Sequence, residues 1–172
     1  MKRLNVKTLV VCSFLIALNV ILSRFIAIPG IINFGGFPII FAGVVLGPFV
    51  GGLVGVVGDI VSFLVKPTGA FMPHFVLTSA LTGIIPGLVM LQFKIERGQG
   101  PFWKILLAIF VGQLITSILM VPYFLHILYG LPWQVTVIKA LSKQAINIPV
   151  YALLIKILAE SLNRAKVLND IG

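Results

Sequence analysis

The sequence predicts an all-α integral membrane protein with six transmembrane helices, which form one membrane domain over residues 1–172. The chain is 59% hydrophobic and only 10% charged, and its mean hydropathy is +1.15. Such a chain carries too little polar surface to cover a soluble globule. Because one span takes about 20 residues, the 172 residues allow six spans with short connections and leave little for a soluble domain.

Six apolar runs, separated by polar stretches or by glycine and proline, define the expected helices. The second run is too short to cross an undistorted hydrocarbon core of about 30 Å upright. Gly47 and Pro48 predict the turn after it, since proline is well tolerated at the first position of a helix. Pro122 predicts a kink near the outer end of the fifth run. The helices are expected at about residues 8–23, 36–46, 48–65, 74–93, 102–128 and 133–163.

The net charge of +9 could suggest a nucleic-acid partner, but the positions of the cations indicate a membrane topology instead. Lysines and arginines precede the first run, surround the central polar loop and follow the last run. With six spans, all of these groups fall on one side, which the positive-inside rule assigns to the cytoplasm. Both termini are therefore expected in the cytoplasm, and no nucleic acid is expected to bind. The cations are Lys2, Arg3, Lys7, Lys94, Arg97, Lys104, Arg164 and Lys166.

The first apolar run follows the basic start MKR, as the apolar part of a signal peptide would. No convincing small-residue cleavage site follows, so a retained first helix is expected. The lone Cys12 in this run excludes an internal disulfide, and we expect it to pack or to face lipid. Ser13 and Ala17 form a small-xxx-small pair, which either lets another helix approach closely or serves ordinary packing within the bundle.

A stripe of glycines marks the third run and the run before it. Gly43, Gly47, Gly51 and Gly55 recur every four residues and lead to Asp59. No Gly-Lys-Ser/Thr follows them, so they indicate close helix contacts and not a phosphate loop. Asp59 is the only acid in the spans before the inner end of the last helix. A charged group in lipid costs roughly 2.5–3.5 kcal/mol, so Asp59 is expected to face protein, water or a ligand.

The last run carries the most polar stripe of the sequence. Lys139, Lys143, Asn147 and Tyr151 follow one another at intervals of four, with Gln144 beside them. The two lysines could snorkel outward, but Asn147 and Tyr151 extend the stripe deeper than snorkelling explains. The stripe therefore favours a ligand-facing surface.

The fourth run has a second polar face, in which His74, Thr78 and Thr82 lie at four-residue spacing. This face either lines a polar cavity or carries a structural histidine with hydroxyl neighbours. No second His or Cys lies at metal-ligand spacing, and His126 is far away in sequence. A zinc site is therefore not expected, and neither another metal nor a cofactor is indicated.

The charges expected in the outer half of the spans describe a ligand. Arg24, Lys66, Lys139 and Lys143 outnumber Asp59, so a pocket that opens outward would be positive and would attract an anion. Carboxamide groups could instead recognise a heterocycle that carries both donors and acceptors. A flat aromatic molecule with a carboxylate tail fits both. The outer segment FIAIPGIINF is too apolar to lie open to water, so it is expected to fold over the outer face as a lid.

Three segments are similar to a known family. The chain contains NFGGFPIIFAGVVLGPFVGGLVGVVGDIVSFLV with its G-x-x-x-G-x-x-G-D-I run, then KPTGAFMPHF, and later SKQAINIPVY. Together with the six-span length, they resemble the S components of energy-coupling-factor (ECF) vitamin transporters, most of all the folate-specific branch. The resemblance implies the S-component fold in a bacterial plasma membrane, with vitamin bound on the outer face beneath gating loops. It also implies as partners a transmembrane coupling subunit and two ATP-hydrolysing subunits.

The resemblance assigns further roles to individual residues. Ser13 and Ala17 match the small-residue motif that docks on the coupling subunit, although the family often has alanine at both positions. Two outer segments match the gating loops, the first with Phe25, Pro29, Gly30, Asn33 and Phe34, the second from Lys66 to Met72 with Phe71 and Met72. The candidate substrate-binding residues are Arg24, Asn147 and Tyr151, followed by Lys143, Gln144, His74, Asp59 and Lys66.

The predicted function is high-affinity folate capture outside the cell, followed by loop closure and reorientation against the coupling subunit. The chain has no nucleotide motif, so the energy must come from partners, and the chain is not expected to be an enzyme. An S component for pantothenate or riboflavin is the nearest alternative. An intramembrane enzyme that uses His74 and Asp59 as acid and base, or an assembly subunit with purely structural polar stripes, are alternatives from other classes.

Overall fold

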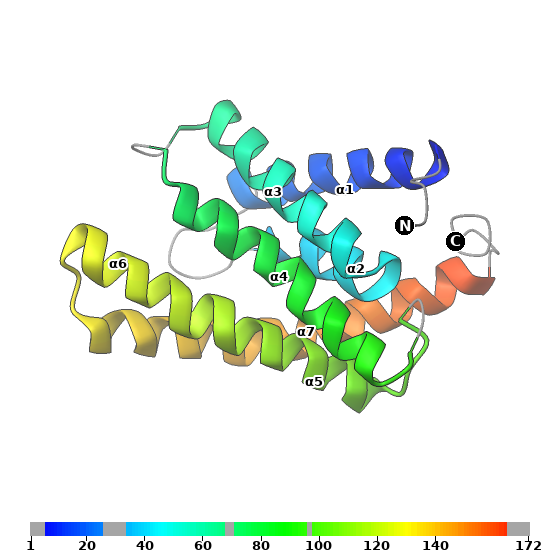
Figure 1. The fold of residues 1–172 in the computed structure, drawn as a ribbon. Coiled ribbons are helices and arrows are strands. Elements are labelled where there is room, and N and C mark those ends of the chain that lie inside the picture. Colours follow the sequence, from blue (N-terminus) through cyan, green and yellow to red (C-terminus); the bar gives the residue numbers. More distant parts are fainter. Residues whose placement is uncertain (1–5, 26–33, 68–70, 96–97, 165–172) are drawn as a thin grey trace.

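The computed structural model describes residues 6–25, 34–67, 71–95 and 98–164, and these form an all-helical bundle (Figure 1). Residues 102–129 form one continuous helix whose middle part is π-helical, so the described residues form six helical rods. The elements are α1 (Val6–Arg24), α2 (Gly36–Leu46), α3 (Pro48–Val65), α4 (Pro73–Gln92), α5 (Phe102–Gln113), η1 (Leu114–Met120), α6 (Val121–Tyr129) and α7 (Trp133–Arg164).

The rods begin and end within two residues of the predicted bounds. Five of them are long and apolar enough to cross a membrane, and α2 is the shorter apolar helix. A π-helical stretch, which the sequence does not predict, precedes the proline at which a kink is expected. Proline has no N–H to donate to the helix, and α-helical geometry resumes at Val121, one residue before Pro122.

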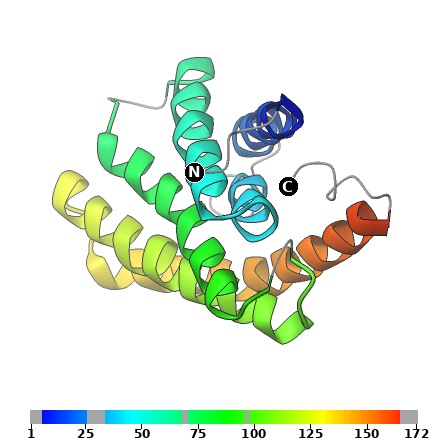
Figure 2. The same ribbon diagram turned by 45° about the vertical axis from the view of Figure 1, so that its right-hand side comes forward.

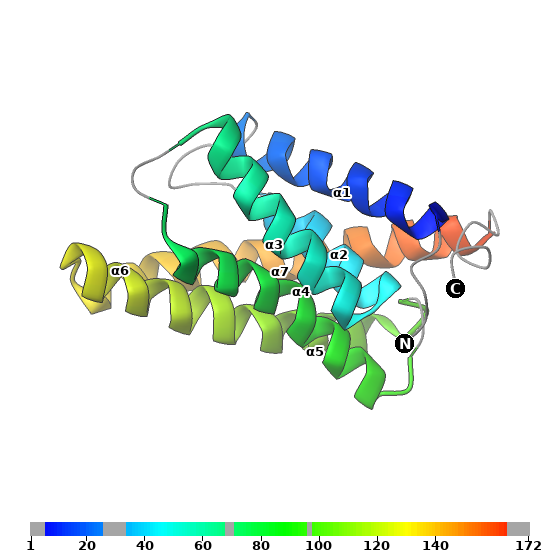
Figure 3. The same ribbon diagram turned by 45° about the horizontal axis from the view of Figure 1, so that its top comes forward.

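The helices form two groups. Helices α2, α3 and α4 pack on one another, and α1 lies against α2 and α3. In Figures 1 and 2, α7 runs alongside the rod formed by α5, η1 and α6, and this pair forms the second group. Helix α4 contacts α5 and so joins the two groups. The turned view in Figure 3 shows the first turn of α1 and the last turn of α7 at the same end of the bundle.

Glycines bring α2, α3 and α4 into backbone contact. A Cβ added at Gly43 would overlap the carbonyl of Gly83 on α4, and one at Gly51 would lie 2.5 Å from the Cα of Gly43. A Cβ at Gly87 would lie 2.7 Å from the carbonyl oxygen of Gly43. The prediction of close helix contacts is thereby confirmed. Gly47 is the exception within the stripe, because it forms the turn before Pro48 with φ of +102°, a conformation that favours glycine.

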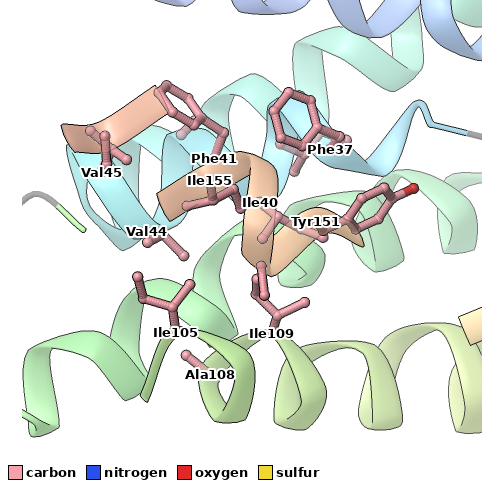
Figure 4. Packing of buried hydrophobic residues seen from close by; sticks show 14 of the residues in the cluster. Phe37, Ile40, Phe41, Val44, Val45, Ile105, Ala108, Ile109, Tyr151 and Ile155 are labelled. Carbon is pink, nitrogen blue, oxygen red and sulfur yellow. The ribbon is translucent and has the colours of Figure 1, made fainter. Parts of the chain in front are cut away.

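Helix α2 is buried on every side, as its uniformly apolar sequence requires. Residues 37–45 are all buried. Figure 4 shows Ile40 and Val44 of α2 near Ile105 and Ile109 of α5, with Tyr151 and Ile155 of α7 in the same cluster. Aliphatic contacts on one side and glycine contacts on the other thus hold a helix too short to span the membrane by itself.

We expect Gly43→Ala to lower the free energy of unfolding by about 1–3 kcal/mol, because the added methyl group has to displace backbone. Gly36→Ala is the matched control on the same helix, since a Cβ there would meet its nearest atoms at 3.9 Å. Thermal melting of the two purified variants in detergent measures the difference. Equal melting temperatures would show that the glycine contact does not set the helix spacing.

Candidate functional site

A cavity of about 390 Å³ lies among the last two turns of α1 and α3, the first turn of α2, the first half of α4 and the middle of α7. Its volume falls in the range of small-molecule sites. The positive-inside rule predicts cytoplasmic termini, and with that topology the last turn of α1, and with it the cavity, faces the outer side of the membrane. It is lined by Asn19, Ser23, Arg24, Gly35, Gly36, Ile39, Asp59, Ser62, Phe63, Phe71, Met72, Phe75, Thr78, Ser79, Thr82, Gln113, Ser117, Val121, Tyr129, Lys143, Gln144, Asn147 and Tyr151.

Three charged side chains line the cavity, namely Arg24 at the end of α1, Asp59 on α3 and Lys143 on α7. Ser79 is a hydrogen-bond partner of the Asp59 carboxylate, and the charge of Arg24 attracts the same carboxylate. Two cations against one acid leave an excess of positive charge. The cavity therefore favours an anionic ligand, as the sequence predicts.

Helix α7 supplies the polar groups at the deeper end of the cavity. Gln144, Asn147 and Tyr151 are 7%, 3% and 2% exposed, respectively. Gln144 Oε1 and Asn147 Nδ2 have no hydrogen-bond partner among the described residues. Tyr151 packs against the rings of Phe34 and Phe37, at centroid distances of 6.1 and 6.0 Å. Figure 4 shows its hydroxyl pointing away from the aliphatic side chains of the core.

A hydrogen-bonded chain of side chains borders the cavity between α1 and α3. Asn19 Nδ2 donates to the carbonyl oxygen of Gly35 at 2.6 Å, and Ser62 Oγ donates to Asn19 Oδ1 at 3.3 Å. The hydroxyls of Ser23 and Ser62 lie 3.3 Å apart. Gly58 leaves room for this chain, because a Cβ there would lie 2.8 Å from Asn19 Oδ1. The chain ties α1 to α3 and to the residue before α2.

The hydroxyl groups on α4 and η1 are already used within the protein. Thr78 and Thr82 donate to carbonyl oxygens four residues earlier, at 2.9 and 2.8 Å. Ser117 of η1 donates to Gln113 Oε1. These residues give the wall its polarity, but their hydroxyl protons are not available to a ligand without rearrangement.

Aromatic and sulfur contacts close one side of the mouth. Phe71 packs edge-on against Phe63 of α3 at 5.2 Å between ring centroids. The Tyr129 hydroxyl donates to Met72 Sδ at 3.6 Å. The segment before α4 is thus held between α3 and the end of α6, where it borders the cavity.

The structure brings together six of the eight candidate substrate-binding residues, Arg24, Asp59, Lys143, Gln144, Asn147 and Tyr151. It does not bring His74 and Lys66 to the cavity. His74 is exposed and packs against the ring of Phe124 at 5.1 Å, and Lys66 is exposed at the end of α3. The other two members of the predicted α4 face, Thr78 and Thr82, do line the wall.

The candidate loop residues fall in several places. Phe71 and Met72 line the cavity, Phe34 contacts Tyr151, and Phe25 is 71% exposed. Pro29, Gly30 and Asn33 lie outside the described residues. Ser13 and Ala17 are exposed on α1 and do not line the cavity.

Several lining residues were not predicted, above all Asn19, Ser62 and Ser79. Asn19 and Ser62 have apolar neighbours on both sides, and Ser79 directly follows Thr78 but falls outside the four-residue spacing of that face, so no periodic pattern marks them. Their one common signal is a polar side chain at membrane depth, which normally faces protein or a cavity. Among the residues that the structure describes, no group of three or more His, Cys, Asp or Glu side chains could hold a metal ion.

A polar cavity of this size within a helical membrane protein is typical of membrane proteins that bind a small solute. Comparison with known proteins gives the family. A sequence model described as "ECF-type riboflavin transporter, S component" matches residues 3–164. The chain belongs to the S components of ECF transporters, which confirms the resemblance, the S-component fold and the multi-pass location in a bacterial membrane.

Two individual proteins are also similar. The folate transporter FolT of Clostridium novyi (strain NT) is 29% identical over 175 residues, covering 100% of this chain and 98% of that protein. A crystal structure of FolT bound with folic acid superposes with a TM-score of 0.76 at 25% identity, covering 91% of this chain and 95% of that one. An S component is a substrate-binding subunit and not an enzyme, and its family implies the coupling subunit and the ATP-hydrolysing subunits as partners.

Proposed function

We propose that this S component binds folate. The main support is the composition of the cavity, which combines the cations Arg24 and Lys143 with the buried carboxamides Gln144 and Asn147. Folate has a flat pterin ring with donors and acceptors on its edge and a glutamate tail with two carboxylates. Carboxamides match the ring edge, and cations match the tail. The similarity to FolT supports the same vitamin.

Riboflavin is the second candidate, because the matching family model carries its name. Riboflavin also has a flat ring with donors and acceptors, but its ribityl tail is uncharged. The excess of positive charge at the mouth therefore favours folate. Pantothenate has a carboxylate but no ring for the carboxamides of α7 to recognise, so the cavity favours it least.

In the transport cycle that we propose, the chain captures folate from the outer side, closes its loops over the cavity and reorients against the coupling subunit. The surface for that subunit is the exposed face of α1 around Ser13 and Ala17. These two small residues lie one turn apart and permit close approach of another helix. Ser13 Oγ donates to the Leu9 carbonyl within α1 at 3.0 Å, so it presents no free hydroxyl proton to the membrane.

Arg24→Gln and Lys143→Gln should each weaken folate binding about 10- to 100-fold, because a hydrogen bond to a charged group contributes about 1.5–3 kcal/mol. Lys139→Gln is the matched control, since Lys139 lies one turn from Lys143 on α7 but is exposed and does not line the cavity. Titration calorimetry of the purified protein measures the affinities. Unchanged affinity in both cavity variants, or an equal loss in the control, would contradict the proposed role of the cations.

Replacing Ser13 and Ala17 by Leu should abolish ATP-driven folate uptake while the affinity for folate stays unchanged, because the larger side chains keep the coupling subunit away from α1. The measurement is folate uptake into vesicles that contain the complete transporter, with Val6→Leu as a control at another exposed position of α1. Vesicles that contain the wild-type chain alone should bind folate without concentrating it. Accumulation by the chain alone would overturn the coupling-dependent mechanism.

A further inference from the structure

A cluster of aromatic and basic side chains joins the end of α4 to the first turn of α5. The Lys104 ammonium nitrogen lies 5.4 Å from the ring centroid of Phe93 and 5.5 Å from that of Trp103. The two rings pack edge-on at 6.1 Å between centroids. In Figures 1 and 3, the last turn of α4 and the first turn of α5 lie at the end of the bundle where α1 begins and α7 ends. With the predicted topology, the cluster therefore lies at the cytoplasmic face of the membrane.

The rings hold the Lys104 charge in place without neutralising it. Among the residues that the structure describes, the Lys104 ammonium group has no ion-pair partner and no hydrogen-bond acceptor. Aromatic rings attract a cation but offer no acceptor oxygen, so its three N–H donors remain available. A second cation, Lys94, directly follows Phe93 and is exposed. The pair of lysines therefore favours a ligand that is anionic and accepts hydrogen bonds.

An exposed apolar face of α5 begins at the same cluster. Trp103, Leu107 and Phe110 follow one another at spacings of four and three, so they lie on one face of the helix. Their exposed fractions are 56%, 38% and 45%. This face extends about 10 Å along the helix axis into the membrane. It suits an acyl chain, whereas a free inorganic anion would make no use of it.

We propose that Lys94, Lys104 and Trp103 bind the phosphate headgroup of an anionic phospholipid from the inner leaflet. One acyl chain of this lipid lies along Leu107 and Phe110. A zwitterionic lipid carries a cation of its own, which the two lysines repel, so the site selects anionic headgroups. An acidic segment of a cytoplasmic protein could match the lysines, but it would leave the apolar face at membrane depth uncovered.

The lipid site is separate from the other surfaces of the protein. None of its residues lines the cavity. In Figures 1–3, α5 lies on the side of the bundle away from α1, whose exposed face we propose for the coupling subunit. A lipid on α5 and a coupling subunit on α1 can therefore be bound at the same time.

Native mass spectrometry of the full chain in detergent tests the proposal, with dioleoylphosphatidylglycerol as the anionic probe and dioleoylphosphatidylcholine as the zwitterionic one. Each cation near a headgroup contributes about a 5-fold preference for an anionic lipid. The wild type should therefore prefer phosphatidylglycerol about 25-fold, Lys104→Gln about 5-fold, and the double variant Lys94→Gly, Lys104→Gln not at all.

Lys139→Gln is the matched control, because it removes one exposed cation near the opposite end of the bundle and should leave the preference unchanged. Equal binding of the two lipids by the wild type, or an equal loss in this control, would overturn the proposal. Glycerol 3-phosphate, which has the charge but no acyl chains, should not displace phosphatidylglycerol. Displacement at equal concentration would mean that the site takes a free anion and not a lipid.

Lys94→Gly separates lipid recognition from helix stability. Lys94 has φ of 52°, a left-handed conformation that favours glycine. Without lipid, the variant should melt within about 2 °C of the wild type, because relief of this conformation offsets the lost attraction between the lysine and the C-terminus of α4. The rise in melting temperature on adding phosphatidylglycerol should shrink. A lower melting temperature with an unchanged rise would show a purely structural lysine and would contradict the proposal.

Folate titration of the same variants keeps this proposal apart from the proposed function. Lys104→Gln should bind folate as the wild type does, since the cluster lies outside the cavity. A wild type that binds phosphatidylglycerol selectively but not folate would contradict the folate function and leave the lipid site standing. Loss of folate affinity in Lys104→Gln would show that the cluster acts on the cavity, and its assignment as a separate lipid site would be wrong.

Discussion

The backbone contact of α2, α3 and α4 is the constraint on which the rest of the structure depends. Helix α2 is too short to span the bilayer, so it cannot be positioned by the membrane. Gly43, Gly51 and Gly83 let the three helices approach until backbone meets backbone. In membranes such packing replaces the hydrophobic effect as the force between helices. Fixing α2 in this way also fixes its first turn, where Gly36 and Ile39 border the cavity.

The cavity that results separates two kinds of recognition along its depth. Arg24 lies at the end of α1, and Lys143 lies on α7 one turn before Asn147. The neutral carboxamides of Gln144 and Asn147 are buried, where a charge would be penalised most. The one acid, Asp59, is hydrogen-bonded to Ser79 and attracted by Arg24, so it moderates the positive potential of the site. This order suits a ligand with a neutral ring and an anionic tail.

The sequence predicts the helices and the class of protein well, because long apolar runs and flanking cations are signals that survive without tertiary information. It also predicts the polar stripe of α7, since four-residue spacing places side chains on one face. It does not predict which way a lone polar residue faces. Asn19 and Ser62 reach the cavity and His74 does not, because the rotation of each helix is set by its neighbours. The π-helical turns of η1 leave no sequence signal beyond Pro122, so their position also emerges only from the fold.

The proposed function requires that this chain by itself forms a complete site for one folate molecule. Native mass spectrometry of the protein, purified in detergent from folate-replete cells without its partner subunits, tests this claim most directly. We expect one ligand with the mass of folate or a folate derivative per chain, lost on denaturation. A protein that carries no ligand and does not bind added folate, or one that retains a ligand without a cyclic amide ring, would contradict the proposed function.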